Sequence, residues 1–365
     1  MKRNVILFVF SVCMFAVNAQ EKADNASIVT EQEKKMNFTV VSDGSFGDVV
    51  MPVVERTKKN ISWWTGSVLA PVQNGKEIAF LYKKGTFGIG KFSTDSLSSK
   101  SSVAEGREIV GFSFSPDGKY LCFSEKQGER HVVCLSSLPN TVSYTEVTSV
   151  GDNYSPVFSP DGEKLYYCCI SNNEEPTIKS YDIQHGVTTN VVEGMNPVPT
   201  PDGKTLVYCR QLGDGLYSIW KFDLQTGVKT CIARSFSGGS FTSPAVSPDG
   251  KWVAMTGNSS VEVGNWDIYN NYYDYSNSDM INLKNTDIYV CRIDGSGLRQ
   301  LTNYPADDIS PVWGSNGKYI YFVSQRGSDA INLVQRSDGK RIFFVSKRSL
   351  SSAKANVWRM DFKEE

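Results

Sequence analysis

Short runs of apolar residues, each preceded by the same kind of polar turn, recur along the chain. The turn reads Ser-Pro-Asp-Gly or Thr-Pro-Asp-Gly and stands at 115–118, 159–162, 200–203 and 247–250, with divergent copies at 72–75 and 314–317. An apolar run follows each turn, for example Tyr120-Leu121-Cys122-Phe123. Proline pre-sets φ, aspartate suits the bend and glycine takes the left-handed conformation. Each copy therefore predicts a tight turn and then a strand that is buried on both faces.

The spacing of these turns predicts the fold. Their glycines stand at 75, 118, 162, 203, 250 and 317; four of the five intervals are 41 to 47 residues long, and the last is 67. A second motif, an aliphatic residue four positions before an aspartate, ends at Asp182, Asp223 and Asp361 and marks a third strand. A repeat of roughly 40–50 residues with several strands is typical of a propeller blade. We expect an all-β, six-bladed β-propeller with four antiparallel strands per blade.

These residues resemble the TolB-type propeller repeat. The resemblance is strongest from Ile288-Tyr289 through Asp294-Gly295, Leu301-Thr302, Asp308, Ser310-Pro311, Trp313 and Gly317-Lys318 to Phe322-Val323-Ser324, and it covers about residues 63–362. It implies the propeller fold and, by analogy with TolB, a periplasmic protein that docks partners through its channel face. The same repeat also occurs in peptidase propeller domains and in glycan-active enzymes, so the fold alone does not decide the function. TolB proteins carry an α/β domain before the propeller, which the resemblance does not include.

The N-terminus is typical of a secretory signal peptide. Lys2 and Arg3 precede a 13-residue apolar run, Val5 to Val17, and the small residue Ala19 suits cleavage before Gln20. A lipoprotein signal using Cys13 is the weaker alternative, because the apolar run continues past that cysteine. We expect residues 1–19 to be removed, residues 20–36 to be a flexible leader and the protein to reside in the periplasm or outside the cell.

The propeller is expected to occupy residues 37–365. Its last blade ends at Val357 to Phe362 with only three residues remaining, so that blade lacks its own outermost strand. The strand-like segment Asn37 to Val41 is the expected donor, which closes the ring with an N-terminal strand.

Charge argues against several classes of partner. Removing Lys2 and Arg3 with the signal peptide lowers the 38 basic residues to 36, against 39 acidic residues, and no basic stripe is present. Nucleic-acid binding is therefore disfavoured. No later stretch is apolar and long enough to span a membrane, so we expect a soluble monomer without a membrane span.

Cysteine and histidine positions argue against a metal or cofactor. Seven cysteines follow the signal peptide, none in a Cys-x-x-Cys pair, and most fall on expected strands, so we interpret them as small apolar core residues. His131, expected in a loop of blade two, and His185, in a turn of blade three, fall on opposite faces of a propeller. No Gly-x-Ser-x-Gly elbow or phosphate-binding loop is present. We expect no catalytic residue, metal site or cofactor.

Two insertions interrupt the repeat between the second and third strands of neighbouring blades. The insertion of blade six, about 326–354, contains a turn and an apolar run that predict an extra hairpin. The insertion of blade five, about 258–286, carries aromatic residues beside Asn and Asp, a combination that suits sugar stacking or a peptide interface. The alternative is that these aromatic residues fold back onto the blade and pack there. The predicted ligand-binding residues are Trp266, Tyr269, Tyr272 and Tyr273, with Tyr154 and Asp308 of the strand-entry loops beside them.

The function predicted from the sequence is an exported, non-catalytic propeller that docks an envelope protein or a glycan on its channel-mouth face. The alternative is a glycan-active lyase or hydrolase with carboxylates at the channel mouth, because 39 acidic residues are available and glycoside chemistry needs only two of them. Asp307 and Asp308 also suit a hard cation, although aspartate at this position is a routine feature of the repeat.

Overall fold

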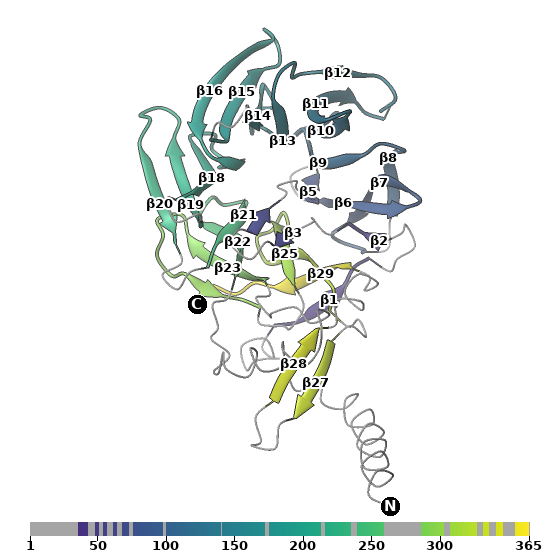
Figure 1. Ribbon diagram of the computed structural model, residues 1–365, viewed down its shortest axis with the longest axis vertical. Coiled ribbons are helices and arrows are strands. Elements are labelled where there is room, and N and C mark those ends of the chain that lie inside the picture. The colour runs from purple at the N-terminus through teal and green to yellow at the C-terminus, as the bar shows by residue number, and fades with distance from the viewer. Residues whose placement is uncertain are drawn as a thin grey trace, which may run out of the picture.

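The computed structural model describes a ring of antiparallel sheets (Figure 1). The described residues are 36–42, 48–50, 54–56, 61–63, 68–72, 76–97, 100–139, 141–171, 175–212, 216–234, 239–258, 286–302, 307–326, 331–335, 341–345 and 355–364. They contain strands and no helix, and nothing in this part of the chain forms a helix that could cross a membrane. The expected all-β class is confirmed.

Six four-stranded blades follow one another around the ring. Blade one contains β5 (Leu69–Val72), β6 (Glu77–Lys84), β7 (Thr86–Ser93) and β8 (Lys100–Glu105), and blade two contains β9 (Ile109–Phe114), β10 (Tyr120–Gln127), β11 (Arg130–Ser137) and β12 (Tyr144–Glu146). Blade three contains β13 (Asp152–Phe158), β14 (Lys164–Ile170), β15 (Thr177–Asp182) and β16 (Val187–Glu193). Blade four contains β17 (Met195–Pro199), β18 (Thr205–Gln211), β19 (Tyr217–Asp223) and β20 (Lys229–Ala233), and blade five contains β21 (Phe241–Val246), β22 (Trp252–Asn258), β23 (Thr286–Arg292) and β24 (Arg299–Gln300).

Blade six is closed by the N-terminal strand, as predicted. Its order is β1 (Phe38–Val40), β29 (Asn356–Asp361), β26 (Tyr319–Ser324) and β25 (Asp308–Trp313). Phe38 pairs with Met360 and Val40 with Trp358, so residues from the two ends of the propeller share one sheet. The strand β2 (Asp48–Val49), which the sequence did not suggest, extends the edge of β6 in blade one.

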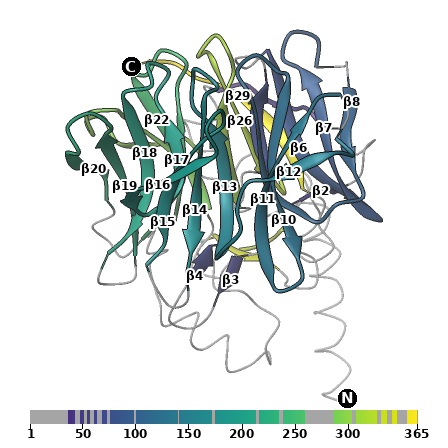
Figure 2. The ribbon, with the colours of Figure 1, turned by 90° about the horizontal axis from the view of Figure 1, so that it is seen from above.

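Two short hairpins lie outside the blades. The hairpin of β27 (Ile331–Gln335) and β28 (Arg341–Val345) confirms the extra hairpin predicted in the insertion of blade six, and it extends beyond the ring (Figure 1). The hairpin of β3 (Val54–Arg56) and β4 (Ile61–Trp63) lies near the centre of the ring in Figure 1 and below the blades in Figure 2. The second hairpin therefore stands at one end of the central channel.

The repeated turn closes through its own side chains. In blade two the amide of Gly118 donates to the carbonyl of Ser115 at 2.9 Å, and the Ser115 hydroxyl donates to Asp117 Oδ1 at 2.6 Å. The same serine–aspartate or threonine–aspartate bond occurs in blades three, four and five. The turn glycines have φ between 67° and 77°, which is why glycine is needed at this position. The predicted turn is confirmed in all four copies.

The core is shared between blades. One buried cluster joins Phe80 of blade one, Phe123 of blade two and Tyr321 of blade six, and another joins blades three, four and five around Val207. The central apolar runs of the second strands, such as Leu121 to Phe123 and Leu206 to Cys209, are fully buried, as their lack of polar residues predicts. Each blade therefore gains its stability from its neighbours, which is the property that makes ring closure important.

Candidate functional site

The ring has two different ends. The turn face carries the Ser-Pro-Asp-Gly turns between first and second strands. The opposite end, here called the insertion face, carries the connections from second to third strands, including both insertions. In Figure 2 the second strands β10 and β14 run towards the insertion face, where the β3–β4 hairpin also lies.

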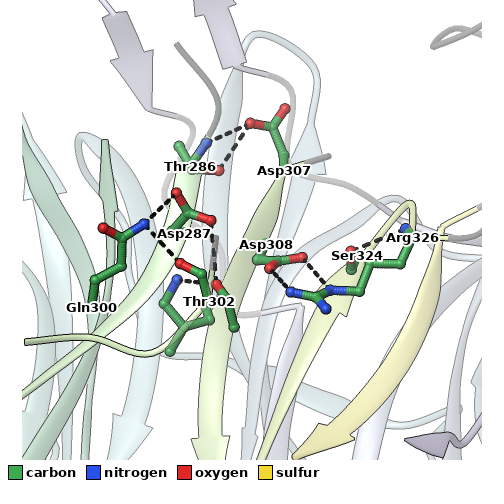
Figure 3. A network of polar contacts seen from close by, with 9 residues as sticks. Thr286, Asp287, Gln300, Thr302, Asp307, Asp308, Ser324 and Arg326 are labelled. Atoms are coloured by element: carbon green, nitrogen blue, oxygen red, sulfur yellow. Dashed lines mark hydrogen bonds and ion pairs between the residues drawn. The ribbon is translucent and has the colours of Figure 1, made fainter. Parts of the chain in front are cut away.

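A polar network holds the roots of both insertions on neighbouring blades (Figure 3). The insertion of blade five leaves after Asn258 and returns at Thr286. The Thr286 amide and hydroxyl donate to Asp307 Oδ1 at 2.8 and 3.0 Å, and Asp307 directly precedes the first strand of blade six. Asp307 therefore ties the return of one insertion to the start of the next blade.

Asp308 forms a buried ion pair at the root of the second insertion. Its side chain is fully buried, and its oxygens accept from Arg326 Nε at 3.1 Å and from the terminal guanidinium nitrogen Nη2 at 2.5 Å (Figure 3). The Arg326 guanidinium also lies 4.4 Å from the ring centre of Phe38 in the closing strand. This bidentate ion pair links the innermost strand of blade six, the start of its insertion and the N-terminal strand.

Asp287 completes the network one residue after Thr286. It is fully buried and accepts from Gln300 Nε2 at 3.0 Å and from the Thr302 hydroxyl at 3.4 Å. The Thr302 hydroxyl in turn accepts from the Ile288 amide at 2.9 Å. Each of these three carboxylates is thus engaged by protein donors, and no group of three or more candidate metal ligands occurs among the residues that the structure describes.

At the junction of blades two and three, an aspartate at the start of one blade again binds the start of the preceding blade's third strand. Asp152 Oδ1 accepts from the His131 amide at 2.6 Å and contacts His131 Nδ1 at 2.9 Å, while Asp152 Oδ2 accepts from the Tyr154 hydroxyl. The Tyr154 and His131 rings lie 4.7 Å apart. Burial, followed by the bond to Asp152, raises the pKa of Tyr154 far above its ordinary value, so this phenol stays neutral and donates.

At three junctions, one position of the repeat caps the third strand of the preceding blade. Asp152, Ser240 and Asp307 each accept from a backbone amide of that strand, and each lies three residues before a non-glycine residue with positive φ.

The structure places the two histidines differently. His131 is the second residue of β11 and does not lie in a loop, which corrects the prediction. His185 does lie in its predicted turn, where its amide donates to Asp182.

The predicted ligand-binding residues do not gather in the described part of the structure. Trp266, Tyr269, Tyr272 and Tyr273 lie outside the described residues. Tyr154 is only 4% exposed and Asp308 is fully buried, and they belong to blades three and six, on opposite sides of the ring. Both residues secure junctions between strands at the insertion face, and their role in binding stays a prediction.

A cavity of about 480 Å³ occupies the turn-face half of the channel. Its lining runs from the positive-φ residue of the innermost strands to the prolines of the turns. Ten lining residues are prolines and seven are serines, and none of the described residues that line it is ionisable. The sequence contained a signal for it, since a Ser-Pro or Asn-Pro pair begins seven residues before four of the turn glycines, at 155, 196, 243 and 310.

A comparison with known families matches residues 95–282, just over half of the chain, to the TolB β-propeller domain. No curated protein matches the chain.

Among solved structures, TolB from Acinetobacter baumannii is similar, with 17% identity and a TM-score of 0.53 over 70% of this chain and 60% of that one. This chain thus spans less than two thirds of that protein. A candidate TolB from Agrobacterium tumefaciens has 16% identity and a TM-score of 0.51, over 84% of this chain and 95% of that one. At these identities the similarity shows the fold alone.

Proposed function

The chain belongs to the TolB β-propeller domain family, and from this premise we propose that it is an exported, non-catalytic module that docks a partner protein on its insertion face. Export is proposed from the basic start, the apolar run Val5 to Val17 and the small residue Ala19. The expected location is the periplasm or the cell exterior.

The arrangement of the two insertion roots is the observation that carries this proposal. Both insertions leave from the same end of adjacent blades, and Asp307 and the Asp308–Arg326 pair hold their roots. Buried ionic and hydrogen-bonded networks favour one arrangement of the groups they join when every member is satisfied. Two long segments that start from one secured platform can form a single continuous interface.

The composition of the first insertion supports a protein partner. Trp266, Tyr269, Tyr272 and Tyr273 lie within eight residues of one another in the sequence, and aromatic residues are enriched in the energetic centres of protein interfaces. A connection between two strands needs only two to five residues. Each additional ordered residue costs about 1–2 kcal/mol of backbone entropy, which contact with a partner can offset.

The carboxyl groups in the described part of the chain give less support to a catalytic function. A glycosidase needs two facing carboxyl groups about 5–10 Å apart beside a substrate pocket. The described lining of the channel cavity has no carboxyl group, and Asp287, Asp307 and Asp308 already accept hydrogen bonds from the protein. We therefore propose binding and do not propose turnover.

The test replaces Trp266, Tyr269, Tyr272 and Tyr273 with serine, which keeps the length of the insertion. The matched control is Tyr120→Ser, because Tyr120 is 44% exposed at the turn face. A partner is first identified by cross-linking in envelope extracts, and its affinity is then measured with purified proteins. We expect the protein with all four substitutions to bind its partner at least about 30-fold more weakly, as is usual when interface hot spots are lost. The control variant should bind with unchanged affinity.

Three outcomes would overturn the proposal. Unchanged affinity of the protein with all four substitutions would show that the interface lies elsewhere. Loss of its folded state, measured by circular dichroism, would show that these aromatics are core residues. Binding on a glycan array without any protein partner would replace the protein partner with a sugar.

A further inference from the structure

The turn-face half of the channel is a second site, separate from the insertion face. The β3–β4 hairpin stands at the insertion end, whereas the cavity of about 480 Å³ reaches the turns at the other end. This volume falls within the range of about 300–1,000 Å³ that is usual for small-ligand pockets. Any group that enters it meets a different set of residues from a partner on the insertion face.

The cavity excludes charge. None of the described lining residues can ionise, so a charged group inside would lose its hydration without gaining a counter-ion. Such burial is costly and strongly disfavoured. The turn aspartates Asp161 and Asp202 do not offset this cost, because they are exposed to water, bind their own turns and do not line the cavity. An occupant must therefore be neutral.

Proline dominates the wall and keeps it rigid. Pro116 and Pro160 at the turns are half-buried, while Pro201 and Pro248 are exposed. Successive turns lie in close proximity around the ring. A side-chain Cβ at Gly162, Gly203 or Gly250 would lie only 3.6–3.9 Å from a ring carbon of the proline in the preceding blade's turn. A wall with fixed φ and few rotamers loses little entropy when a ligand enters.

Proline rings are good partners for aromatic rings. An aromatic ring has a negative face that attracts C–H groups, and proline segments are recognised by aromatic surfaces in many complexes. Here the protein supplies the prolines. The inner end of the cavity adds polar groups, Ser155, Asn196, Ser243 and Ser310, and the Ser155 hydroxyl donates to Asn196 Oδ1 at 2.9 Å. These groups suit a neutral ligand with a hydrogen-bonding atom at one end.

We propose that the turn-face cavity binds an uncharged aromatic group that carries a hydrogen-bonding atom, such as an indole. The group can belong to a small molecule or to a side chain of an extended peptide, and the chemistry of recognition is the same in both cases. The insertion-face interface is not required for this binding.

The experiment uses protein labelled with ¹³C only at proline, since ten of its 14 prolines line the cavity. The probes are indole, N-acetyl-tryptophanamide, its anionic counterpart N-acetyl-tryptophan, and the aliphatic N-acetyl-leucinamide. With indole and with N-acetyl-tryptophanamide we expect changes in the chemical shifts of the labelled prolines. We also expect intermolecular nuclear Overhauser effects between proline and probe. We also expect at least about tenfold weaker binding of the anion and of the leucine compound. Tighter binding of indole would indicate a small molecule, and tighter binding of the amide a peptide, and both support the proposal.

Val198→Trp tests the location by filling the cavity from blade four, where Val198 is half-buried in the lining. Val187→Trp is the matched control, because Val187 is 53% exposed at the turn face and does not line the cavity. Binding should disappear only in the first variant. The absence of proline contacts with both aromatic probes in the unmodified protein would overturn the proposal whether or not the variants fold. Equal binding of the anion, or unchanged binding by a folded Val198→Trp protein, would also overturn it.

Discussion

At the scale of single residues, carboxylates at the insertion face act as structural bonds between strands. Asp308 is the clearest case, because both of its oxygens bind one guanidinium and its side chain is fully buried. Other aspartates form exposed ion pairs. Asp249, in a turn of blade five, lies 3.5 Å from the exposed ammonium group of Lys251. Burial therefore decides how much stability is lost when one partner of an ion pair is removed.

Replacing Asp308 with alanine should strongly destabilise the protein. The change leaves the Arg326 charge buried without its counter-ion, which typically costs about 3–5 kcal/mol in the free energy of unfolding. Urea unfolding measures this loss. The control Lys251→Met should change stability by less than about 1 kcal/mol, and the pair Asp308→Leu with Arg326→Met should recover much of the loss. An Asp308→Ala curve that overlays that of the unmodified protein would show that the ion pair is not a structural bond.

At the scale of elements, the ring depends on one short strand. β1 contributes three paired residues to blade six, and Phe38 packs edge-on against Phe322 at 6.3 Å. Met36 lies just before β1 and packs partly against the same core cluster. The packing of the propeller therefore includes residue 36.

Deleting residues 20–41 should lower stability, whereas deleting residues 20–35 should not. The longer deletion removes the backbone bonds of β1 and the contact of Phe38, together worth roughly 2–4 kcal/mol, and exposes the edge of β29. Thermal unfolding of the two truncated proteins, made without the first 19 residues, provides the comparison. Equal melting temperatures would mean that β1 does not close the ring.

At the scale of the whole molecule, the described blades are held without cross-links. All seven cysteines of the described residues are free, and six of them are buried in blades two to five. Burial raises the pKa of the Cys134, Cys209 and Cys291 thiols to about 12, so little thiolate forms near neutral pH. Cys231 is the exposed exception, which corrects the expectation that all of them are core residues.

Thiol labelling should therefore report how the ring opens. In the folded protein we expect only the exposed Cys231 to be labelled, slowly because partial burial raises the pKa of its thiol, and the other six to react only on unfolding. Because every blade packs on two neighbours, the six should share one rate constant within about threefold, as one cooperative unit. Mass spectrometry of each labelled cysteine measures this. Separate rates for different blades would show independent opening, and fewer than seven thiols after unfolding without reductant would reveal a disulfide.

Local chemistry allowed much of the fold to be predicted from the sequence. A turn such as Ser159-Pro160-Asp161-Gly162 needs only its own residues to form, so six copies, five of them spaced by 41 to 47 residues, determined the number of blades. Hydrophobic runs determined the buried second strands, and the strand-like segment Asn37 to Val41 indicated the strand that β1 supplies to blade six. These features depend on neighbours in the chain, which a sequence shows directly.

Only the tertiary structure decided what the strand-entry residues do. The pairing of β13 with β14 shifts between Tyr154 and Val157, around Ser155 with φ of 50°, and Tyr154 engages His131 and Asp152 at the junction of blades two and three. Arg326, which binds Asp308 within blade six, meets Phe38 only because the ring closes, although Phe38 is 288 positions away in the chain. The proline-lined cavity likewise exists only when the innermost strands meet around the axis. Contacts between blades depend on where the backbone bulges point each side chain, and the spacing of the turns does not encode that direction.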